Sequence, residues 1–402
     1  MVCLILNERD DKSMAIIIYH ANLIQRDKIL ENCGIVVEGK RIVHIFTGEY
    51  KPAFGDQLID AEGRYLSPGF IDSHMHGGGG ADVMDGTEEA VVHMSETHAR
   101  HGLTSFLPTT LTASVPAIQK ACATVCAVMK KSYRGATILG IHLEGPFISL
   151  KYKGAQNPAH IQKPSVDAYL EISNGGENVK RVSMAPELEG AFELGSYLSK
   201  KGILVSAAHT DADYNVMREA LKYGFSHVTH CYNGMSGLQS PDYYCRAGTV
   251  ESALELDGYA AEVIGDGKHM PPEMIRLLMK CKRPEQVMLT TDSTRPADMP
   301  EGEYELGGLP VLVTDGVAML ADRSAFAGSV ATMDVLVRNA VKNVGIPLPK
   351  AVAMVSYNTA LSLGIEKERG SLGEGMIADA VLFDDEIHVS TVMREGKIIF
   401  DE

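Results

Sequence analysis

The stretch Leu66-Ser-Pro-Gly-Phe-Ile-Asp-Ser-His-Met-His76 is an apolar run that ends in two histidines, and four glycines follow it at positions 77–80. Side chains at positions i and i+2 of a strand point to the same face, so His74 and His76 can bind one metal ion at a strand end. The glycines allow another backbone or a ligand to approach closely. The stretch therefore predicts a metal site whose remaining ligands come from other strand ends.

The residues after this stretch alternate between strand-like and helix-like segments. Helix-like segments such as 114–131, 211–223 and 271–280 separate the strand-like runs. Those runs are 104–110, 137–144, 181–185, 203–210, 227–232, 259–264 and 287–292. Together with 66–76 they make eight strands, which predicts an α/β protein with a (β/α)8 TIM-like barrel over residues 66–365. A doubly wound sheet is the alternative architecture, and residues 300–330 are expected to form a β-hairpin insert.

Both ends of the chain are rich in short strands. Residues 15–65 and 366–402 contain runs such as Gly34-Ile-Val-Val-Glu38 and Lys397-Ile-Ile-Phe400, bounded by polar turns. Each end alone has too few strands to bury a core. We therefore expect one small flanking β-sandwich built from both termini.

Polar residues of metal-ligand type end several of the predicted barrel strands. They are His74, His76, Glu144, His209, His230 and Asp292, and a further histidine, His269, follows the seventh strand. In barrel enzymes this end of the strands carries the chemistry. Each residue alone has a structural explanation; Asp292, for example, could cap a helix. Six at matching strand ends predict a site for Zn²⁺, Fe²⁺, Mn²⁺ or Co²⁺.

Other histidines fit structural roles better. His93, His98 and His101 fall on a predicted helix and are expected at its surface. His142 shares a face with Glu144 in a regular strand, so it is expected beneath the site and is left out of the metal set.

Composition narrows the class of protein. The 402 residues carry a formal net charge of −15, which argues against nucleic acid or an anionic membrane as a partner. The seven cysteines show no disulfide framework, which fits a reducing cytoplasm. The first ten residues lack the basic region of a signal peptide, and no apolar run approaches 18 residues.

The ordered motifs resemble the N-acetylglucosamine-6-phosphate deacetylases of the amidohydrolase superfamily. Pro68-Gly-Phe-Ile-Asp-Ser-His-Met-His76 is similar to the superfamily's opening signature. The motifs similar to the deacetylases are His142-Leu-Glu-Gly-Pro-Phe147, Ala185-Pro-Glu187, Ala208-His-Thr210, Thr229-His-Cys-Tyr-Asn233, Asp266-Gly-Lys-His269, Thr291-Asp292 and Ala327-Gly-Ser329. The resemblance implies a barrel with a flanking β-sandwich, a homodimer, and an amino-sugar phosphate as substrate.

The resemblance also implies roles for individual residues. Glu144, His209 and His230 would hold the catalytic divalent metal, and His74, His76, Glu144 and Asp292 a second one, giving one or two ions per subunit. Asp292 would be the catalytic acid and base, and His269 would contact the substrate near its acetyl carbonyl. The remaining substrate contacts would be Ala155, Gln156, Asn233, Gly234 and Arg246. Arg246 matches the arginine that binds the sugar phosphate, often across the dimer.

Three positions depart from the family pattern. The family's Lys-Gly-Ala-His-Asn reads Lys153-Gly-Ala-Gln156-Asn157 here, and a glutamine cannot carry a positive charge. The stretch between His230 and Arg246 is longer than usual, and Asn-Pro-Ala reads Asn358-Thr-Ala360. The first two bear on the substrate rather than on the reaction type. The alternatives are therefore an N-acetylgalactosamine 6-phosphate deacetylase, another amidohydrolase acting on a cyclic amide, and a non-catalytic barrel.

Overall fold

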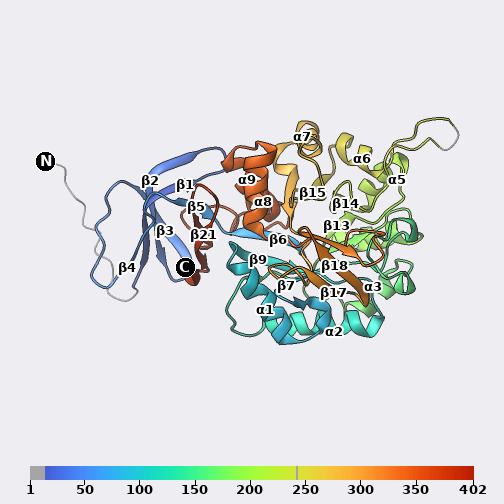
Figure 1. The fold of residues 1–402 in the computed structure, drawn as a ribbon, viewed down its shortest axis with the longest axis horizontal. Coiled ribbons are helices and arrows are strands. Elements are labelled where there is room, and N and C mark those ends of the chain that lie inside the picture. The colour runs from blue at the N-terminus through green and yellow to red at the C-terminus, as the bar shows by residue number, and fades with distance from the viewer. Residues whose placement is uncertain (1–13, 241–242) are drawn as a thin grey trace.

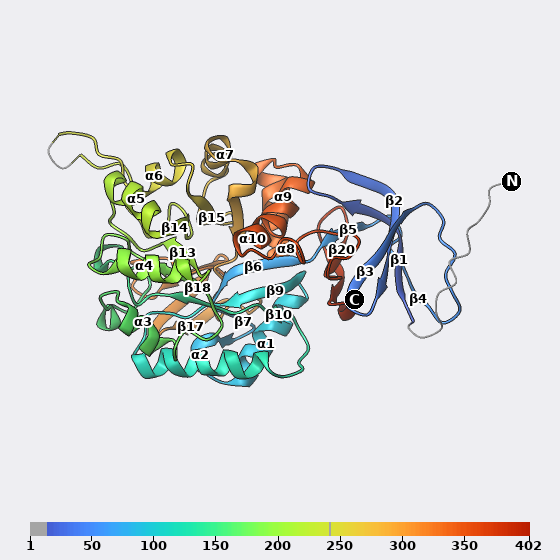
Figure 2. The ribbon, with the colours of Figure 1, turned by 180° about the vertical axis from the view of Figure 1, so that it is seen from behind.

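The computed structural model describes residues 14–240 and 243–402, which form a mixed α/β fold (Figure 1). Residues 1–10, whose sequence lacks the basic region of a signal peptide, lie outside this part of the chain. A strand-rich region built from both ends of the chain lies beside a larger region of parallel strands and helices, and the view from behind in Figure 2 shows the same division.

The parallel strands lie in two sheets. One has the order β11-β12-β13-β14-β15-β16 and the other the order β10-β9-β6. Their bounds are β6 Phe70–Met75, β9 Leu103–Pro108, β10 Thr137–Ile138, β11 Ile141–Glu144, β12 Val179–Met184, β13 Leu204–Ala207, β14 Phe225–Val228, β15 Ala260–Ile264 and β16 Val287–Thr290. Isolated parallel bridges join Met75 to Ser293 and Thr109 to His142, one at each junction between the sheets. Every predicted strand range thus overlaps a strand. β9, β12 and β14 begin one or two residues earlier than expected, and most strands end earlier.

Helices alternate with these strands along the chain. Their bounds are α1 Glu88–Ala99, α2 Val115–Met129, α3 Val166–Ile172, α4 Ala191–Lys200, α5 Tyr214–Ala220, α6 Thr249–Glu255, α7 Pro272–Cys281, α8 Met333–Asn339, α9 Leu348–Met354 and α10 Tyr357–Ser362. In α2, a proline stands in the first turn and Ile118, Cys122 and Val125 recur at helical spacing on the buried face. This face packs into the main hydrophobic core with the strands.

The terminal strands share one sheet. Its order is β22-β21-β20-β5-β1-β2-β3, with β4 also paired to β1. The bounds are β1 Ile16–Ile24, β2 Ile29–Glu38, β3 Arg41–Thr47, β4 Gln57–Asp60, β5 Tyr65–Pro68, β20 Ala380–Phe383, β21 Val389–Arg394 and β22 Lys397–Asp401. The sheet is mixed, because β4 and β5 run parallel to β1 while the other pairs are antiparallel. Residues from both termini, including Ile35 and Leu382, share its core.

Two local expectations need correction. The run 66–76 is not one strand: β5 pairs with β20 in the terminal sheet, and Gly69 separates it from β6 in the parallel region. A Cβ at Gly69 would lie 2.2 Å from the side chain of Thr104, so the chain passes here through a space that only glycine fits. The expected hairpin insert is a three-stranded antiparallel sheet, β17 Gly302–Leu306, β18 Leu309–Thr314 and β19 Val317–Leu320.

His98 is also not at the surface. It is fully buried on α1, and its Nε2 donates to the carbonyl oxygen of Gly77 at 3.0 Å, because the glycine loop folds back over the helix. Burial lowers the pKa of His98 to about 4, so this ring is neutral.

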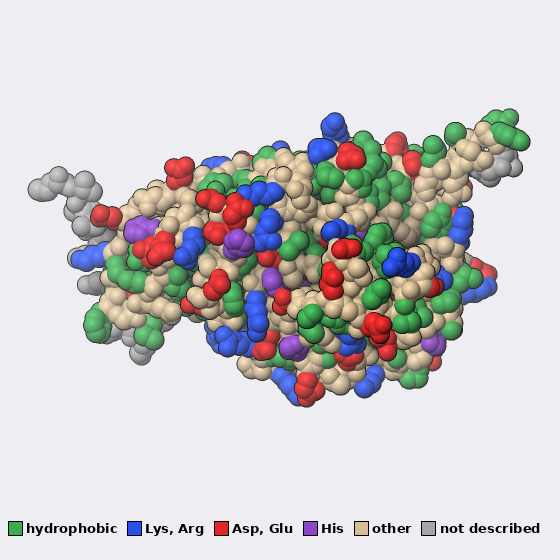
Figure 3. Space-filling model, viewed as in Figure 1, with side chains coloured by type: hydrophobic (Ala, Val, Ile, Leu, Met, Phe, Trp, Pro, Cys, Tyr) green, Lys and Arg blue, Asp and Glu red, His purple; other side chains and the backbone are tan. Residues whose placement is uncertain are grey.

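The surface carries mixed charge. On the face seen in Figure 3, acidic and basic side chains are interspersed without a broad basic area. Among the described residues, none of the helices combines the length and apolar character needed to cross a bilayer.

Candidate metal centre and substrate cavity

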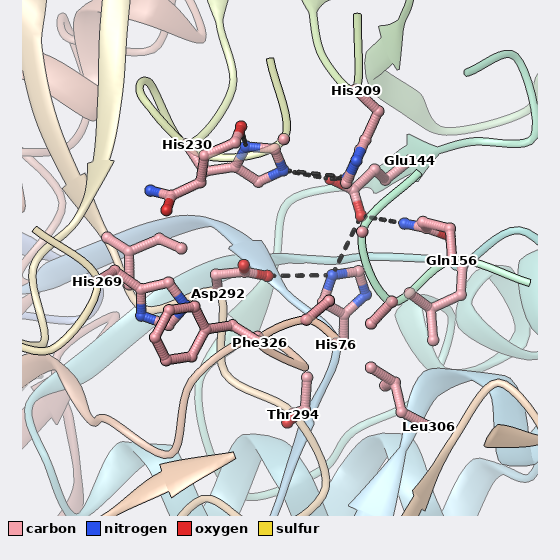
Figure 4. A pocket seen from close by; sticks show the side chains of 18 residues that line it. His76, Glu144, Gln156, His209, His230, His269, Asp292, Thr294, Leu306 and Phe326 are labelled. Carbon is pink, nitrogen blue, oxygen red and sulfur yellow. Dashed lines mark hydrogen bonds and ion pairs between the residues drawn. The ribbon is translucent and has the colours of Figure 1, made fainter. Parts of the chain in front are cut away.

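A cavity of about 260 Å³ opens at the carboxyl ends of the parallel strands (Figure 4). One wall is polar and holds His76, Glu144, His209, His230 and Asp292. The lining also includes the apolar side chains of Leu111, Ile264, Leu306, Ala325 and Phe326. The insert supplies Leu306, and the segment after β19 supplies Phe326. The cavity lining therefore combines metal-ligand-type groups with apolar side chains.

The six predicted ligands form two adjoining groups, both buried: His74, His76 and Asp292 in one, Glu144, His209 and His230 in the other. Within the first group, the Nε2 atoms of the two histidines lie 3.2 Å apart, and Asp292 Oδ1 lies 3.3 Å from His74 Nε2 and 3.2 Å from His76 Nε2. In the second group, His230 Nε2 lies 3.2 Å from His209 Nε2 and 3.2 Å from Glu144 Oε1.

Glu144 joins the two groups. Its Oε1 lies 3.4 Å from His74 Nε2 and 3.5 Å from His209 Nε2, while its Oε2 lies 3.4 Å from His76 Nε2. The carboxylate thus faces ligand atoms of both groups at once.

The outer nitrogen of each histidine is held by a group that can only accept a hydrogen bond. Nδ1 of His76, His209 and His230 lies 2.8–3.1 Å from a backbone carbonyl oxygen, and Nδ1 of His74 lies 2.9 Å from a carboxylate oxygen of Glu262. Nδ1 must therefore carry the proton, and Nε2 of each neutral ring presents a lone pair to the centre. This is the arrangement that orients histidines toward a metal.

The spacing of these atoms fits a divalent cation. Ligand atoms at about 2.0–2.1 Å from a tetrahedral Zn²⁺ stand roughly 3.3 Å apart, close to the observed Nε2 separations. Lone pairs facing each other at that distance repel unless a cation or a proton lies between them. Burial disfavours a charged ring, yet Glu144 and Asp292 hold the pKa of His74 well above its usual range and that of His76 at about 9. Protons therefore compete for the same positions as metal.

Hydrogen bonds between the ends of β6 and β16 position two of the predicted ligands. Asp72 is fully buried and accepts hydrogen bonds from the hydroxyls of Thr290 at 2.6 Å and Thr291 at 2.5 Å, and from the backbone N–H of His74 at 3.1 Å. It therefore ties the end of β6 to the end of β16 and brings His74 beside Asp292.

Three of the ligands sit just beyond strand ends in left-handed backbone. The φ angles are 44° at His209, 31° at His230 and 46° at Asp292. Such conformations cost about 1–3 kcal/mol each in non-glycine residues and cluster at functional sites. The turn away from the strand directs each side chain back over the strand ends.

His269 faces the cavity from the loop after β15. Asp266 accepts from its Nδ1 at 2.7 Å and from its backbone N–H at 2.9 Å, which leaves Nε2 available to the cavity. Burial opposes ionisation of Asp266, but the His269 contact keeps its pKa below the ordinary value. The ring of Phe326 lies 4.6 Å from that of His269 and is 41% exposed.

The expected substrate residues are only partly brought together. Ala155, Gln156, Asn233 and Gly234 line the cavity, whereas Arg246 is exposed and outside the lining. The backbone of Arg246 pairs with that of Gln239 through an isolated antiparallel bridge.

Gln156 is bound on both sides by the protein. Its Nε2 donates to Glu144 Oε2 at 2.8 Å (Figure 4), and its Oε1 accepts from the backbone N–H of Thr112 at 2.7 Å. The amide therefore supports a ligand carboxylate as well as lining the cavity.

The glycine run after His76 has a packing role. A Cβ on Gly77 would lie 2.3 Å from a backbone oxygen of Ala81, and one on Gly78 would lie 2.3 Å from His98. No glycine of this run lines the cavity. The atoms that approach the backbone of these glycines closely thus belong to the protein itself and not to a ligand in the cavity.

Sequence reasoning missed Glu262 and Arg181. Both are buried, and their side chains form an ion pair beneath His74. The detectable signal was a single carboxylate inside the otherwise apolar run Ala260-Ala-Glu-Val-Ile264. Burial opposes its ionisation, but Arg181 and His74 hold the pKa of Glu262 well below its usual range.

Comparison with known proteins gives consistent matches. The profile of the amidohydrolase family matches residues 65–399. The chain is 37% identical over 337 residues to N-acetylglucosamine-6-phosphate deacetylase of Vibrio furnissii, covering 84% of this chain and 83% of the relative. It is 34% identical over 382 residues to the Bacillus subtilis enzyme of the same name, covering 94% and 95%. A crystal structure of the Pasteurella multocida deacetylase superposes with a TM-score of 0.89 at 28% identity, covering 96% and 99%.

Proposed function

The chain belongs to the amidohydrolase family and, within it, to the N-acetylglucosamine-6-phosphate deacetylases, and from this we propose that it hydrolyses N-acetyl-D-glucosamine 6-phosphate to glucosamine 6-phosphate and acetate. The observation that carries the proposal is the pair of buried His and carboxylate groups at one end of the parallel strands, beside a cavity. A non-catalytic barrel would have no need of such buried ligand sets.

The metal is proposed to bind where the ligand atoms converge. Glu144, His209 and His230 would hold one divalent ion, and His74, His76, Glu144 and Asp292 would hold a second one. When bound, such an ion supplies Lewis acidity, which polarises an amide carbonyl and lowers the pKa of a coordinated water to about 7. The donor set suits Zn²⁺, Fe²⁺, Mn²⁺ or Co²⁺.

Asp292 is proposed to move the proton. Burial opposes its ionisation, but His74 and His76 hold its pKa below the ordinary value, so it is a carboxylate at neutral pH. It takes a proton from the attacking water as a C–O bond forms at the acetyl carbon, and returns it to the nitrogen as the C–N bond breaks. One water is consumed, and acetate and an amine leave.

His269 is proposed to stabilise the developing oxyanion. Asp266 fixes the ring through Nδ1, and the doubly protonated ring, paired with this carboxylate, would donate from Nε2 to the carbonyl oxygen. One donor of this kind is typically worth about 3–4 kcal/mol of barrier. Phe326 and Leu306 would cover apolar parts of the bound substrate and exclude water.

The phosphate requires a cation, and among the described residues none of the side chains that line the cavity is a lysine or an arginine. We propose that Arg246 supplies it from the neighbouring subunit of a homodimer, because a guanidinium pairs with phosphate bidentately.

We also propose an architecture and a location for the protein. The strands of the two parallel sheets would close into a (β/α)8 barrel over residues 66–365, and residues 15–65 and 366–402 would form the flanking β-sandwich domain. The protein would be cytoplasmic.

Acetate release tests the proposal. The purified protein is assayed with N-acetylglucosamine 6-phosphate, N-acetylgalactosamine 6-phosphate, both unphosphorylated sugars and a dihydropyrimidine, and its metal content is measured on the same sample. The proposal expects the highest kcat/KM for the glucosamine phosphate and at least one divalent ion per chain. Turnover of only the cyclic amide would refute it, and equal rates with and without phosphate would remove the role of Arg246.

A further inference from the structure

Glu262 lies beneath the metal centre in β15 and is 1% exposed. Its Oε1 accepts from His74 Nδ1 at 2.9 Å, and its Oε2 accepts from Ser73 Oγ at 3.0 Å. The guanidinium of Arg181 donates to both oxygens, one contact being 3.2 Å between Nη2 and Oε1. Glu262 does not line the cavity, so it acts only through the residues it touches.

His74 is the only one of the four ligand histidines backed by a carboxylate. In the other three, Nδ1 donates to a neutral backbone carbonyl. A carboxylate partner makes a charge-assisted hydrogen bond, which is shorter and roughly twice as strong as a neutral one. It fixes the ring orientation and increases the electron density that Nε2 offers to a cation. His74 is itself completely buried, so no water can replace this partner.

A simpler explanation is that Glu262 only neutralises the buried Arg181. A buried arginine needs a counter-charge, and removing one partner of such a pair is strongly destabilising. That explanation does not require the contact to His74. The two explanations differ in what happens to metal binding when the pair is removed as a whole.

We propose that Glu262 is a positioning residue that fixes His74, and that Arg181 holds its carboxylate in place, so that the pair determines whether the His74–His76–Asp292 group retains an ion. In the Glu144–His209–His230 group, Glu262 is contacted only by the backbone N–H of His230, at 3.4 Å, and by neither imidazole ring. The ligand atoms of this group are therefore not held by Glu262, and the group should bind its ion independently of the pair. The inference rests on the metal centre of the proposed function, but it concerns occupancy rather than reaction.

Co²⁺ binding to the full-length protein tests the inference. The protein is equilibrated at graded, buffered concentrations of free Co²⁺, and bound ions per chain are counted by elemental analysis. The wild type is expected to bind two ions. In R181M/E262L, which removes both charges together, the Kd of one ion is expected to rise about 10–100-fold while the other is unchanged.

A second variant covers the case in which R181M/E262L does not fold. E262D keeps the counter-charge of Arg181 but withdraws the carboxylate from His74 by about 1.5 Å, one C–C bond. It is expected to weaken the same single ion. R369M/D379L is the control, because it removes a buried ion pair remote from the centre and should leave both ions bound.

Two ions bound with unchanged affinity in E262D or R181M/E262L, even with a lower Tm, would show that Glu262 is only a counterion. Equal weakening of both ions, or a wild type that binds a single ion, would overturn the inference as well. Acetate release does not enter this test, so either proposal can fail without the other.

Discussion

Asp292→Asn separates the two roles assigned to this residue. The carboxylate has Oδ1 at 3.2–3.3 Å from the inward nitrogens of His74 and His76, so an amide oxygen of the same shape can still face the metal. The amide cannot accept a proton from water or return one to a leaving amine. The backbone has φ of 46°, a region that asparagine adopts as readily as aspartate. The substitution therefore adds no backbone strain.

The expected loss is in kcat. A positioned general acid or base contributes typically 10²–10⁴-fold, and Asp292 is assigned both steps in succession. We expect kcat to fall by about 10⁴-fold, equivalent to about 5.5 kcal/mol of barrier. KM should change by less than about threefold, because the cavity keeps its shape and its other polar groups.

Acetate release under saturating substrate measures kcat, and elemental analysis of the same protein measures metal retention. Asp334→Asn is a matched control, because Asp334 is a buried carboxylate that pairs with His101 at 3.2 Å and does not line the cavity. It should keep wild-type kcat. Near-normal turnover of Asp292→Asn would refute the acid and base assignment, and a parallel loss of metal and activity would reduce Asp292 to a ligand.

Three other perturbations follow from the geometry. Gln156→Leu removes the donor to Glu144 and leaves the backbone N–H of Thr112 unpaired, so urea denaturation should show that the free energy of unfolding falls by about 1–3 kcal/mol. The control Gln119→Leu, at a more exposed site, should lower it by less than about 0.5 kcal/mol. Equal losses in the two variants would contradict the buried role of Gln156. Phe326 is 41% exposed, so its burial by bound substrate is worth up to about 2 kcal/mol. Phe326→Ala should therefore raise KM by up to about 30-fold with little change in Tm. An unchanged KM would show that the substrate does not cover this ring. The pKa of His76 in the folded protein is raised to about 9, so in metal-free protein the stability that this residue contributes is complete below about pH 6.5 and is lost as pH rises to 9. Metal affinity should rise over the same pH interval, because protons then leave the positions that metal occupies. Tm measurements and Co²⁺ titrations follow the two effects, and a pH-independent metal affinity would exclude proton competition.

Local patterns in the sequence predicted the candidate ligand set and the order of the strands. An apolar run followed by a ligand-type residue is readable from a few neighbouring positions, and parallel strands bring their carboxyl ends to one edge. For this reason Glu144, His209, His230 and Asp292 could be grouped with the first two histidines before any contact was known. His20 and His44 are exposed on the terminal sheet and do not line the cavity.

Only the tertiary structure decided which groups form hydrogen bonds to the predicted ligands and hold them in place. Glu262 meets His74 across 188 positions of sequence, and Asp72 meets Thr290 across 218. Such pairs depend on the register between strands, which no local pattern fixes. The same holds for Gln156, whose neutral amide spans Glu144 and a backbone N–H, and for the glycines that pack against α1. The sequence thus identified what can bind a metal, and the folded chain decided how each ligand is oriented, because orientation comes from contacts between distant segments.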